Sequence, residues 1–339
     1  MPENLKPFSS LDIPWTEWSD APRFATRYRH LTRAALGDDY HVGVAIEELG
    51  PGKQSSPAHF HIFEEEHVYI LEGALTARIG PDAYDMKAGD YVCYPAGQKA
   101  GHCLVNNSGA TCRYVVVGER NPNDISVYTD TNKVMVRPLS RLTILDLAAV
   151  RGYWDGENTG LPPGQSPPPA PVTPEPPLVP KPPISSHTVA WNQEGPGTGT
   201  TFGGRSKHLT YAAVGKGYHV GMLIESPAPG QRLCPKHYHM LEEEHALILE
   251  GQVTLLLGDE RYEMKAGDYV CFPAGRKVGH SFMNSGSGPC SYLMIGERNP
   301  NDVCVYPDSN KLAVNALNTE ASIFDMSALR RYWDGEGAG

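Results

Sequence analysis

The sequence predicts an all-β protein that consists of two similar domains in tandem. Short runs rich in β-branched and aromatic residues alternate with Gly, Pro, Asn and Asp at intervals of roughly 8–12 residues, which is typical of a β-sandwich or β-barrel. The 35 glycines and 30 prolines suit the many turns of such a fold. The length of 339 residues exceeds that of a typical single domain, so two domains are expected.

The second half of the chain repeats the first. The segment HLTRAALGDDYHVGVAIEELGPG from His30 matches HLTYAAVGKGYHVGMLIESPAPG from His208, and GERNPND begins at both Gly118 and Gly296. The offset is 178 residues through this region and 179 at the closing YWDGE motifs. We therefore expect one fold used twice, with the two copies packed as a pseudo-dimer of approximate two-fold symmetry.

A proline-rich stretch separates the two copies. Residues 161–183 hold 12 of the 30 prolines, and because proline lacks an N–H donor this segment cannot join the interior of a sheet. We expect an extended polyproline II tether, with a docking site for a proline-binding module as the alternative. The predicted organisation is an N-terminal domain over residues 1–160, a linker over 161–184 and a C-terminal domain over 185–339.

Five strands stand out in the first copy, and each has a counterpart in the second. They are expected at residues 40–46, 66–73, 74–80, 91–95 and 112–118. A short helix is expected before each WDGE motif, because apolar residues recur at three and four in residues 145–154 and 324–333.

The strand at 66–73 is apolar on both faces. Val68 and Ile70 share one face, and Tyr69 and Leu71 share the other. Such a strand needs a cover on its outer side, which the N-terminal arm, the partner domain or a second subunit would supply. We expect the two domains to cover each other, and a homodimer is a further option.

Composition narrows the classes of partner and the compartment. Asp and Glu outnumber Lys and Arg by 39 to 29, and the net charge of −10 argues against a nucleic-acid partner. No apolar run is long enough for a membrane helix, and the N-terminus lacks the profile of a signal peptide. Seven scattered cysteines suit reduced thiols, so we expect a cytoplasmic protein.

Histidine and glutamate residues indicate a metal site in each half. His59 and His61 project from the same face of a strand, Glu66 follows after a tight turn, and His102 comes from a later strand. Three imidazoles and one carboxylate are a suitable ligand set for a divalent transition metal. The second half repeats the set with His237, His239, Glu244 and His280.

These segments resemble the two motifs of the cupin superfamily, G-x5/6-H-x-H-x3/4-E-x6-G and G-x5-P-x-G-x2+-H-x3-N. The first motif runs from Gly52 to Gly73 and the second from Gly89 to Asn106, and their copies run from Gly230 to Gly251 and from Gly267 to Asn284. The spacing to Gly73 selects Glu66 over Glu64 and Glu65 as the ligand. One departure is the four residues between Gly97 and His102, where two are commoner.

The resemblance implies a bicupin, that is, two jelly-roll (double-stranded β-helix) barrels in one chain. The closing motifs are similar to those of an uncharacterised bacterial cupin group. The family binds up to one metal per barrel, and the sequence does not distinguish Fe, Mn, Ni or Zn. Cupin chemistry on a small oxygen-rich molecule includes dioxygenation, decarboxylation and other lyase reactions, and sugar isomerisation. Family frequency slightly favours a dioxygenase, an oxidoreductase. No catalytic acid or base is identifiable, so a non-catalytic metabolite-binding protein is the alternative.

The remaining candidates have structural explanations. His67 and His245 follow the ligand glutamates and are expected to point out of the barrels, where they would pack against a neighbouring strand or subunit. A structural role is also expected for His41 and its copy, and for the paired cysteines. The repeated ERNPND segment is interpreted as a polar turn that satisfies its own backbone. Tyrosines at 40, 69 and 91 are candidates to line the mouth of a barrel.

Overall fold

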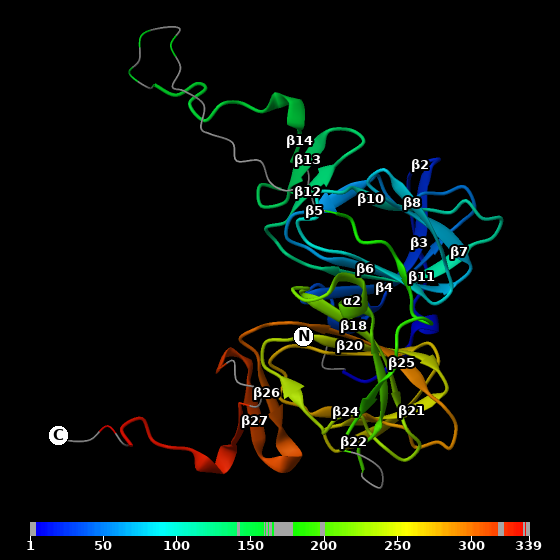
Figure 1. Ribbon diagram of the computed structural model, residues 1–339, viewed down its shortest axis with the longest axis vertical. Coiled ribbons are helices and arrows are strands. Elements are labelled where there is room, and N and C mark those ends of the chain that lie inside the picture. Colours follow the sequence, from blue (N-terminus) through cyan, green and yellow to red (C-terminus); the bar gives the residue numbers. More distant parts are fainter. Residues whose placement is uncertain are drawn as a thin grey trace.

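The computed structural model describes residues 5–140, 143–158, 160, 162, 165, 179–196, 201–317, 322–334 and 336. Two β-rich bodies lie one above the other along the long axis of the molecule (Figure 1). Most of the predicted proline-rich linker lies outside the described residues, and the domain boundaries stay a prediction. Within the described residues no helix is long and apolar enough to span a membrane.

The N-terminal domain consists of two seven-stranded antiparallel sheets. The inner sheet, which faces the other domain, has the order β15 (Ile184–Ser185), β9 (Asp90–Tyr94), β6 (Glu66–Glu72), β11 (Cys112–Glu119), β4 (Val42–Leu49), β3 (Phe24–His30) and β2 (Thr16–Ala21). The outer sheet has the order β14 (Ile144–Asp146), β13 (Lys133–Val136), β12 (Ile125–Tyr128), β5 (His59–His61), β10 (His102–Val105), β7 (Ala74–Ile79) and β8 (Asp82–Lys87).

The C-terminal domain repeats this arrangement. Its inner sheet has the order β1 (Phe8–Ser9), β23 (Asp268–Phe272), β20 (Glu244–Glu250), β25 (Ser291–Glu297), β18 (Val220–Pro227), β17 (Gly204–His208) and β16 (Asn192–Glu194). The outer layer is divided into β19 (Tyr238–His239), β26 (Val303–Tyr306), β27 (Lys311–Val314) and β28 (Ile323–Asp325), and into β22 (Glu260–Lys265), β21 (Gln252–Leu257) and β24 (His280–Met283). The strand order closes none of these described sheets into a complete ring.

Helical structure is sparse and differs from the expectation. Single 3₁₀ turns, η2 (Leu147–Ala149) and η5 (Met326–Ala328), follow edge strands where the sequence predicted short helices before WDGE. Among the described residues, the α-helices are instead α1 (Leu31–Leu36), which precedes β4, and α2 (Leu209–Val214), which precedes β18. The structure also describes the 3₁₀ turns η1 (Ser10–Asp12), η3 (Pro307–Ser309) and η4 (Asn315–Leu317).

The two inner sheets pack against each other, as the two apolar faces of β6 predict. Val68 and Ile70 belong to the core of the N-terminal domain, whereas Tyr69 belongs to a core shared by both domains. The shared core also contains Leu31 from α1 and Leu209 from α2, and both are fully buried. Removing such side chains from water stabilises the pairing by about 1.5–3 kcal/mol each.

The domains also exchange short strands at their edges. The N-terminal strand β1 pairs with β23 of the C-terminal domain, with Phe8 opposite Tyr269. Strand β15, at the start of the C-terminal half, pairs with β9 of the N-terminal domain, with Ile184 opposite Tyr91. Each domain therefore completes the inner sheet of the other.

Candidate metal centres

The first set of predicted ligands converges between the two sheets of the N-terminal domain. His59 and His61 occupy the two ends of β5, so both side chains point to the same face. His102 begins β10 opposite His59, and Glu66 begins β6 in the facing sheet. The Oε2 atom of Glu66 lies 2.7 Å from Nε2 of His102. The Nε2 atoms of His61 and His59 lie 3.7 and 3.8 Å from the same oxygen.

The second set converges in the same way in the C-terminal domain. Oε2 of Glu244 lies 3.0 Å from Nε2 of His280. The Nε2 atoms of His239 and His237 lie 3.5 and 3.8 Å from that oxygen. The structure therefore brings all eight predicted residues into two groups of four.

The unsatisfied atoms of these groups fit a bound cation. Nε2 of His61 is buried and has no hydrogen-bond partner, and the buried Nε2 of His280 and Oε2 of Glu244 lie 3.0 Å apart without the geometry of a hydrogen bond. A buried polar atom without a partner costs free energy, and coordination of a metal would remove that cost. Imidazole nitrogens with one carboxylate oxygen suit Fe, Mn, Ni or Zn. The residues present therefore fit one divalent transition metal in each domain.

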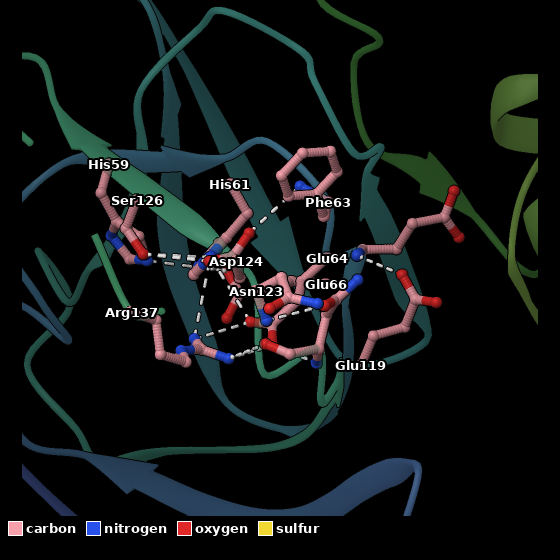
Figure 2. A network of polar contacts seen from close by, with 12 residues as sticks. His59, His61, Phe63, Glu64, Glu66, Glu119, Asn123, Asp124, Ser126 and Arg137 are labelled. Carbon is pink, nitrogen blue, oxygen red and sulfur yellow. Dashed lines mark hydrogen bonds and ion pairs between the residues drawn. The ribbon is translucent and has the colours of Figure 1, made fainter. Parts of the chain in front are cut away.

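Neighbouring acceptors fix the orientation of the imidazoles (Figure 2). The Nδ1 atom of His61 lies 2.6 Å from Oδ2 of Asp124, and His239 has the same relation to Asp302 at 2.7 Å. Nδ1 of His59 lies 2.9 Å from the carbonyl oxygen of Pro57. Hydrogen bonds of this kind select the tautomer that leaves Nε2 free for a metal.

Asp124 and Asp302 correct one sequence-based interpretation. Each is the last residue of a GERNPND segment, which was interpreted as a turn that satisfies its own backbone. Asp124 does accept a hydrogen bond from the backbone N–H of Phe63, but its other oxygen holds a predicted ligand in place. Verbatim repetition of the segment was the only sequence signal.

The protonation states of the first group of candidate ligands favour a bound cation. Burial lowers the pKa of His59 to about 4, so this imidazole is neutral at pH 7. Burial also acts to lower the pKa of His61, but the carboxylates of Glu66 and Asp124 outweigh it and raise the pKa to about 9. The surrounding histidines hold the pKa of Glu66 well below its usual range despite its burial. A metal that bound here near pH 7 would therefore displace a proton from His61.

The two groups differ in the space beside them. Cavities of about 590 and 310 Å³ adjoin the first group, and both are lined by Glu47 and Glu66. The cavity beside the second group, lined by Glu244 and His280, has a volume of about 10 Å³. A small organic molecule therefore has room at the first group and not in the cavity described at the second.

Larger side chains account for the difference. Ala45 and Val116 line the cavities of the N-terminal domain, and the residues 178 positions later are Leu223 and Met294. Leu104 likewise lines the 310 Å³ cavity, and its counterpart is Phe282, whose ring lies 6.0 Å from that of Phe272. Added methylene and ring volume at aligned positions fills the space that the first domain leaves open.

Glu47 is an acid–base candidate that sequence reasoning missed. It lies on β4 and lines both cavities, and its Oε2 atom accepts a hydrogen bond from the hydroxyl of Tyr114 at 2.7 Å. Burial and the nearby charge of Glu66 outweigh this hydrogen bond and raise the pKa of Glu47 to about 7. A carboxyl group with this pKa can both donate and accept a proton near neutral pH.

Other candidate residues lie away from the metal groups. His67 is buried between the domains, where Nδ1 lies 2.7 Å from the hydroxyl of Tyr91, and His245 makes the matching contact with Tyr269. Tyr69 and Tyr91 belong to the shared core and do not line a mouth, whereas Tyr40 lines the 590 Å³ cavity. The paired cysteines are buried, as expected; they are Cys93, Cys271, Cys112 and Cys290.

His41 and its copy connect the domains. Nδ1 of His41 lies 2.8 Å from Oε2 of Glu297, and Nδ1 of His219 lies 2.9 Å from Oε2 of Glu119. These reciprocal contacts support the structural role expected for both histidines.

Comparison with known proteins identifies the family. The cupin domain family matches residues 45–118 and again residues 223–296, so each half contains one cupin domain. The chain is a bicupin and belongs to the cupin superfamily. No curated protein matches the sequence.

Solved bicupin structures share the fold over most of the chain. A glyoxylate-induced protein from Pseudomonas aeruginosa is 17% identical, with a TM-score of 0.54 over 83% of this chain and 84% of that one. An oxalate decarboxylase from Lactobacillus farciminis is 17% identical, with a TM-score of 0.51 over 86% of each chain. A deletion mutant of the Bacillus subtilis oxalate decarboxylase is 18% identical, with a TM-score of 0.51 over 86% of this chain and 76% of that one. At these identities the likeness concerns the fold.

Proposed function

We propose that this bicupin is a metal-dependent enzyme that acts on a small oxygen-rich molecule in its N-terminal domain. One observation carries the proposal: the first ligand group opens onto cavities that contain the buried carboxyl group of Glu47, which the hydroxyl of Tyr114 holds in position. The ligands would be His59, His61, Glu66 and His102. In the C-terminal domain, His237, His239, Glu244 and His280 would hold a second metal with a structural role.

The acid–base group favours proton-transfer chemistry, namely an isomerase or lyase reaction that includes decarboxylation. A bound divalent metal would polarise substrate oxygens and stabilise negative charge that develops on them. Glu47 would take a proton from the substrate or return one to it, and Tyr114 would hold the carboxyl group in position.

A dioxygenase is the second candidate. Three histidines and one glutamate leave two adjacent positions if the coordination is octahedral, and an iron centre of this kind would allow O₂ and substrate to meet. A non-catalytic metabolite-binding protein is less well supported, because that function does not require a protonatable carboxyl group beside the centre.

Metal analysis combined with matched ligand variants tests the proposal. We expect up to two equivalents of a transition metal per chain by inductively coupled plasma mass spectrometry, and one equivalent fewer in either His61→Ala or His239→Ala. Turnover in a screen of small hydroxy, keto and dicarboxylic acids should be lost in His61→Ala and kept in folded His239→Ala.

Two readouts separate the reaction classes. Oxygen consumption would indicate a dioxygenase, and deuterium incorporation from D₂O at a substrate carbon would indicate proton transfer. A reconstituted protein that binds no metal would contradict the enzyme proposal, and so would turnover that depends on His239 alone.

A further inference from the structure

The 590 Å³ cavity extends from the first metal group to a cluster of donor side chains formed by His30, Arg33, Tyr40 and Arg120. On β11, Gly118 is paired with Glu66, and Arg120 follows two residues later, or about 7 Å further along the chain. The backbone N–H of Arg120 donates to the carbonyl oxygen of His41, which holds this end of the wall in register. A small molecule at the metal group can therefore extend toward this donor cluster.

The hydrogen bonds of His30 leave the Tyr40 hydroxyl as a donor. The backbone N–H of Arg33 donates to Nδ1 of His30, so Nδ1 carries no proton. Burial, together with the charges of Arg33 and Arg120, lowers the pKa of His30 to about 4, so the ring is neutral at pH 7 with its proton on Nε2. That proton is donated to the Tyr40 oxygen at 3.0 Å. The hydroxyl proton of Tyr40 is thus left for another acceptor.

Arg120 also has an unused donor. Its guanidinium group stacks over the ring of Tyr40 with 4.6 Å between the guanidinium carbon and the ring centroid. Its Nη1 atom is buried and has no hydrogen-bond partner, and the carboxylate of Asp38 lies 3.8 Å away, beyond hydrogen-bond distance. Arg33 is paired with the same exposed aspartate at 3.1 Å.

The acidic residues of the cavity do not supply the missing partner. Glu64 is paired with Arg137, and Glu119 accepts hydrogen bonds from the backbone N–H of Glu65 and from His219. Glu47 accepts from Tyr114, and Glu66 lies among the histidines. The donors of Tyr40 and Arg120 face a cavity in which these carboxylates already have partners.

The C-terminal domain differs at the equivalent cluster. Arg298, the counterpart of Arg120, donates from Nη2 to the hydroxyl of Tyr218 at 2.9 Å. Arg33 is replaced by Tyr211, and His208 makes no capping hydrogen bond. The arginine donates to the tyrosine there, whereas in the N-terminal domain the buried Nη1 of Arg120 has no hydrogen-bond partner.

We propose that Tyr40 and Arg120 bind an oxyanion group of the substrate, a carboxylate or phosphate, while other oxygens of the same molecule lie at the first metal group. This inference rests on the proposed function and narrows its substrate class to small molecules with a terminal anion. His30 is a positioning residue that turns the Tyr40 hydroxyl into a donor. Charge-assisted hydrogen bonds to a guanidinium group favour such anions strongly.

Binding of matched acid pairs to the Mn(II)-loaded full chain tests this inference. Each pair compares a dianion with the acid that lacks its second anionic group: malonate with acetate, succinate with propionate, glutarate with butyrate, and phosphonoacetate with acetate. Calorimetry measures the dissociation constants. The Mn(II) electron paramagnetic resonance spectrum reports whether the acid binds at the metal. At least one dianion should bind roughly tenfold to a hundredfold more tightly than its partner.

Variants locate the anion site. Arg120→Gln should abolish the preference for the dianion and leave monocarboxylate affinity unchanged, and Tyr40→Phe should reduce the preference. Arg298→Gln is the matched control in the C-terminal domain and should change neither affinity. Equal weakening of monoanion and dianion in Arg120→Gln, or an equal effect of Arg298→Gln, would overturn the inference.

The same data separate this inference from the proposed function. If monocarboxylates perturb the Mn(II) spectrum but no dianion is preferred by the native chain, the anion site is wrong and the metal proposal stands. If no acid perturbs the Mn(II) spectrum, substrate binding at the metal fails, and the anion site fails with it. Preference for phosphonoacetate over malonate would identify phosphate as the anion, and the reverse would identify carboxylate.

Discussion

Glu47 and Glu225 occupy equivalent positions in the two domains and differ in whether they line a cavity. Each lies on the first barrel strand, accepts a hydrogen bond from a tyrosine, and has a pKa raised to about 7 by burial. Glu47 lines both cavities beside the first metal group, whereas the cavity beside the second group does not include Glu225. The two carboxyl groups therefore share their electrostatics and differ in access to a substrate.

The pH dependence of stability tests these pKa values. Because the pKa in the folded state is above the usual 4.5, the folded protein binds the proton more tightly than the unfolded chain does. Glu47→Gln should leave the unfolding free energy of the metal-free protein unchanged below pH 4.5. It should increase that free energy progressively between pH 4.5 and 7, by at most about 3 kcal/mol, and by a constant amount above pH 7. Urea unfolding at a series of pH values measures this.

Glu225→Gln is the matched control for this prediction. It should stabilise the protein over the same pH window, because its pKa is raised for the same reason. Only Glu47→Gln should abolish proton transfer. Loss of turnover in both variants, or pH-independent stability differences, would contradict the roles assigned here.

Sequence reasoning named the candidate ligands, which the structure brings together, and missed Glu47, the candidate acid–base group, for a physical reason. His59, His61 and Glu66 lie close together in the chain, so strand alternation alone predicts their convergence. The elevated pKa of Glu47 arises from burial between strands distant in sequence and from the nearby charge of Glu66, which together outweigh the hydrogen bond from Tyr114. No local pattern encodes that environment.

At the scale of elements, the side chains that point inward from β4 and β11 determine whether a domain contains a cavity beside its metal group. Gly43, Ala45 and Glu47 point into the cavity from β4, and Val116 and Gly118 point into it from β11. The backbone arrangement is the same in the C-terminal domain, where larger side chains occupy two of these positions. The two domains share the same strand geometry, so the side chains at single positions determine the size of the cavity.

Exchange of these side chains tests that explanation. Ala45→Leu with Val116→Met gives the N-terminal domain the residues of the C-terminal domain, so we expect the protein to fold and to keep its full metal content. Turnover should fall by more than tenfold, because the substrate no longer fits. Metal analysis and activity assays measure both effects, and the conservative change Val116→Ile serves as a control. Full activity of the double variant would exclude the cavity as the substrate site.

The two short helices that the sequence predicted before the WDGE motifs show where a local pattern fails to predict an element. Apolar spacing predicted helices in 145–154 and 324–333, yet these segments begin with the edge strands β14 and β28 and then form single 3₁₀ turns. Pairing with β13 and β27 outweighs the weak helical preference of so short a run. Strand positions were predicted better because their alternation reflects burial on two sheet faces.

At the scale of the whole molecule, the interface between the domains is a continuation of their cores. The shared core includes Val44 and Tyr69 from one domain and Met222 and Leu247 from the other. Polar contacts are reciprocal: Glu65 accepts from the backbone N–H groups of His219 and Val220, and Glu243 accepts from those of His41 and Val42. The exchanged strands β1 and β15 add backbone hydrogen bonds at the edges.

Such an interface predicts that the domains unfold as one unit. Separating them would expose fully buried side chains such as Leu209 and leave the carboxylate of Glu65 without its backbone partners. Differential scanning calorimetry should therefore show one transition whose calorimetric and van't Hoff enthalpies agree. Leu209→Ala, in the shared core, should lower the free energy of unfolding by about 2–5 kcal/mol and move that transition as a whole.

Leu255→Ala is the control within the C-terminal domain, because Leu255 is fully buried in a core that includes no residue of the N-terminal β-sheets. Its effect must also reach the N-terminal domain if unfolding is cooperative, so it too should move a single transition. Two resolved transitions, of which Leu255→Ala moves only one, would show that each domain is stable alone. The shared core would then be a contact between independent domains, and the exchanged strands would contribute little to the stability of either.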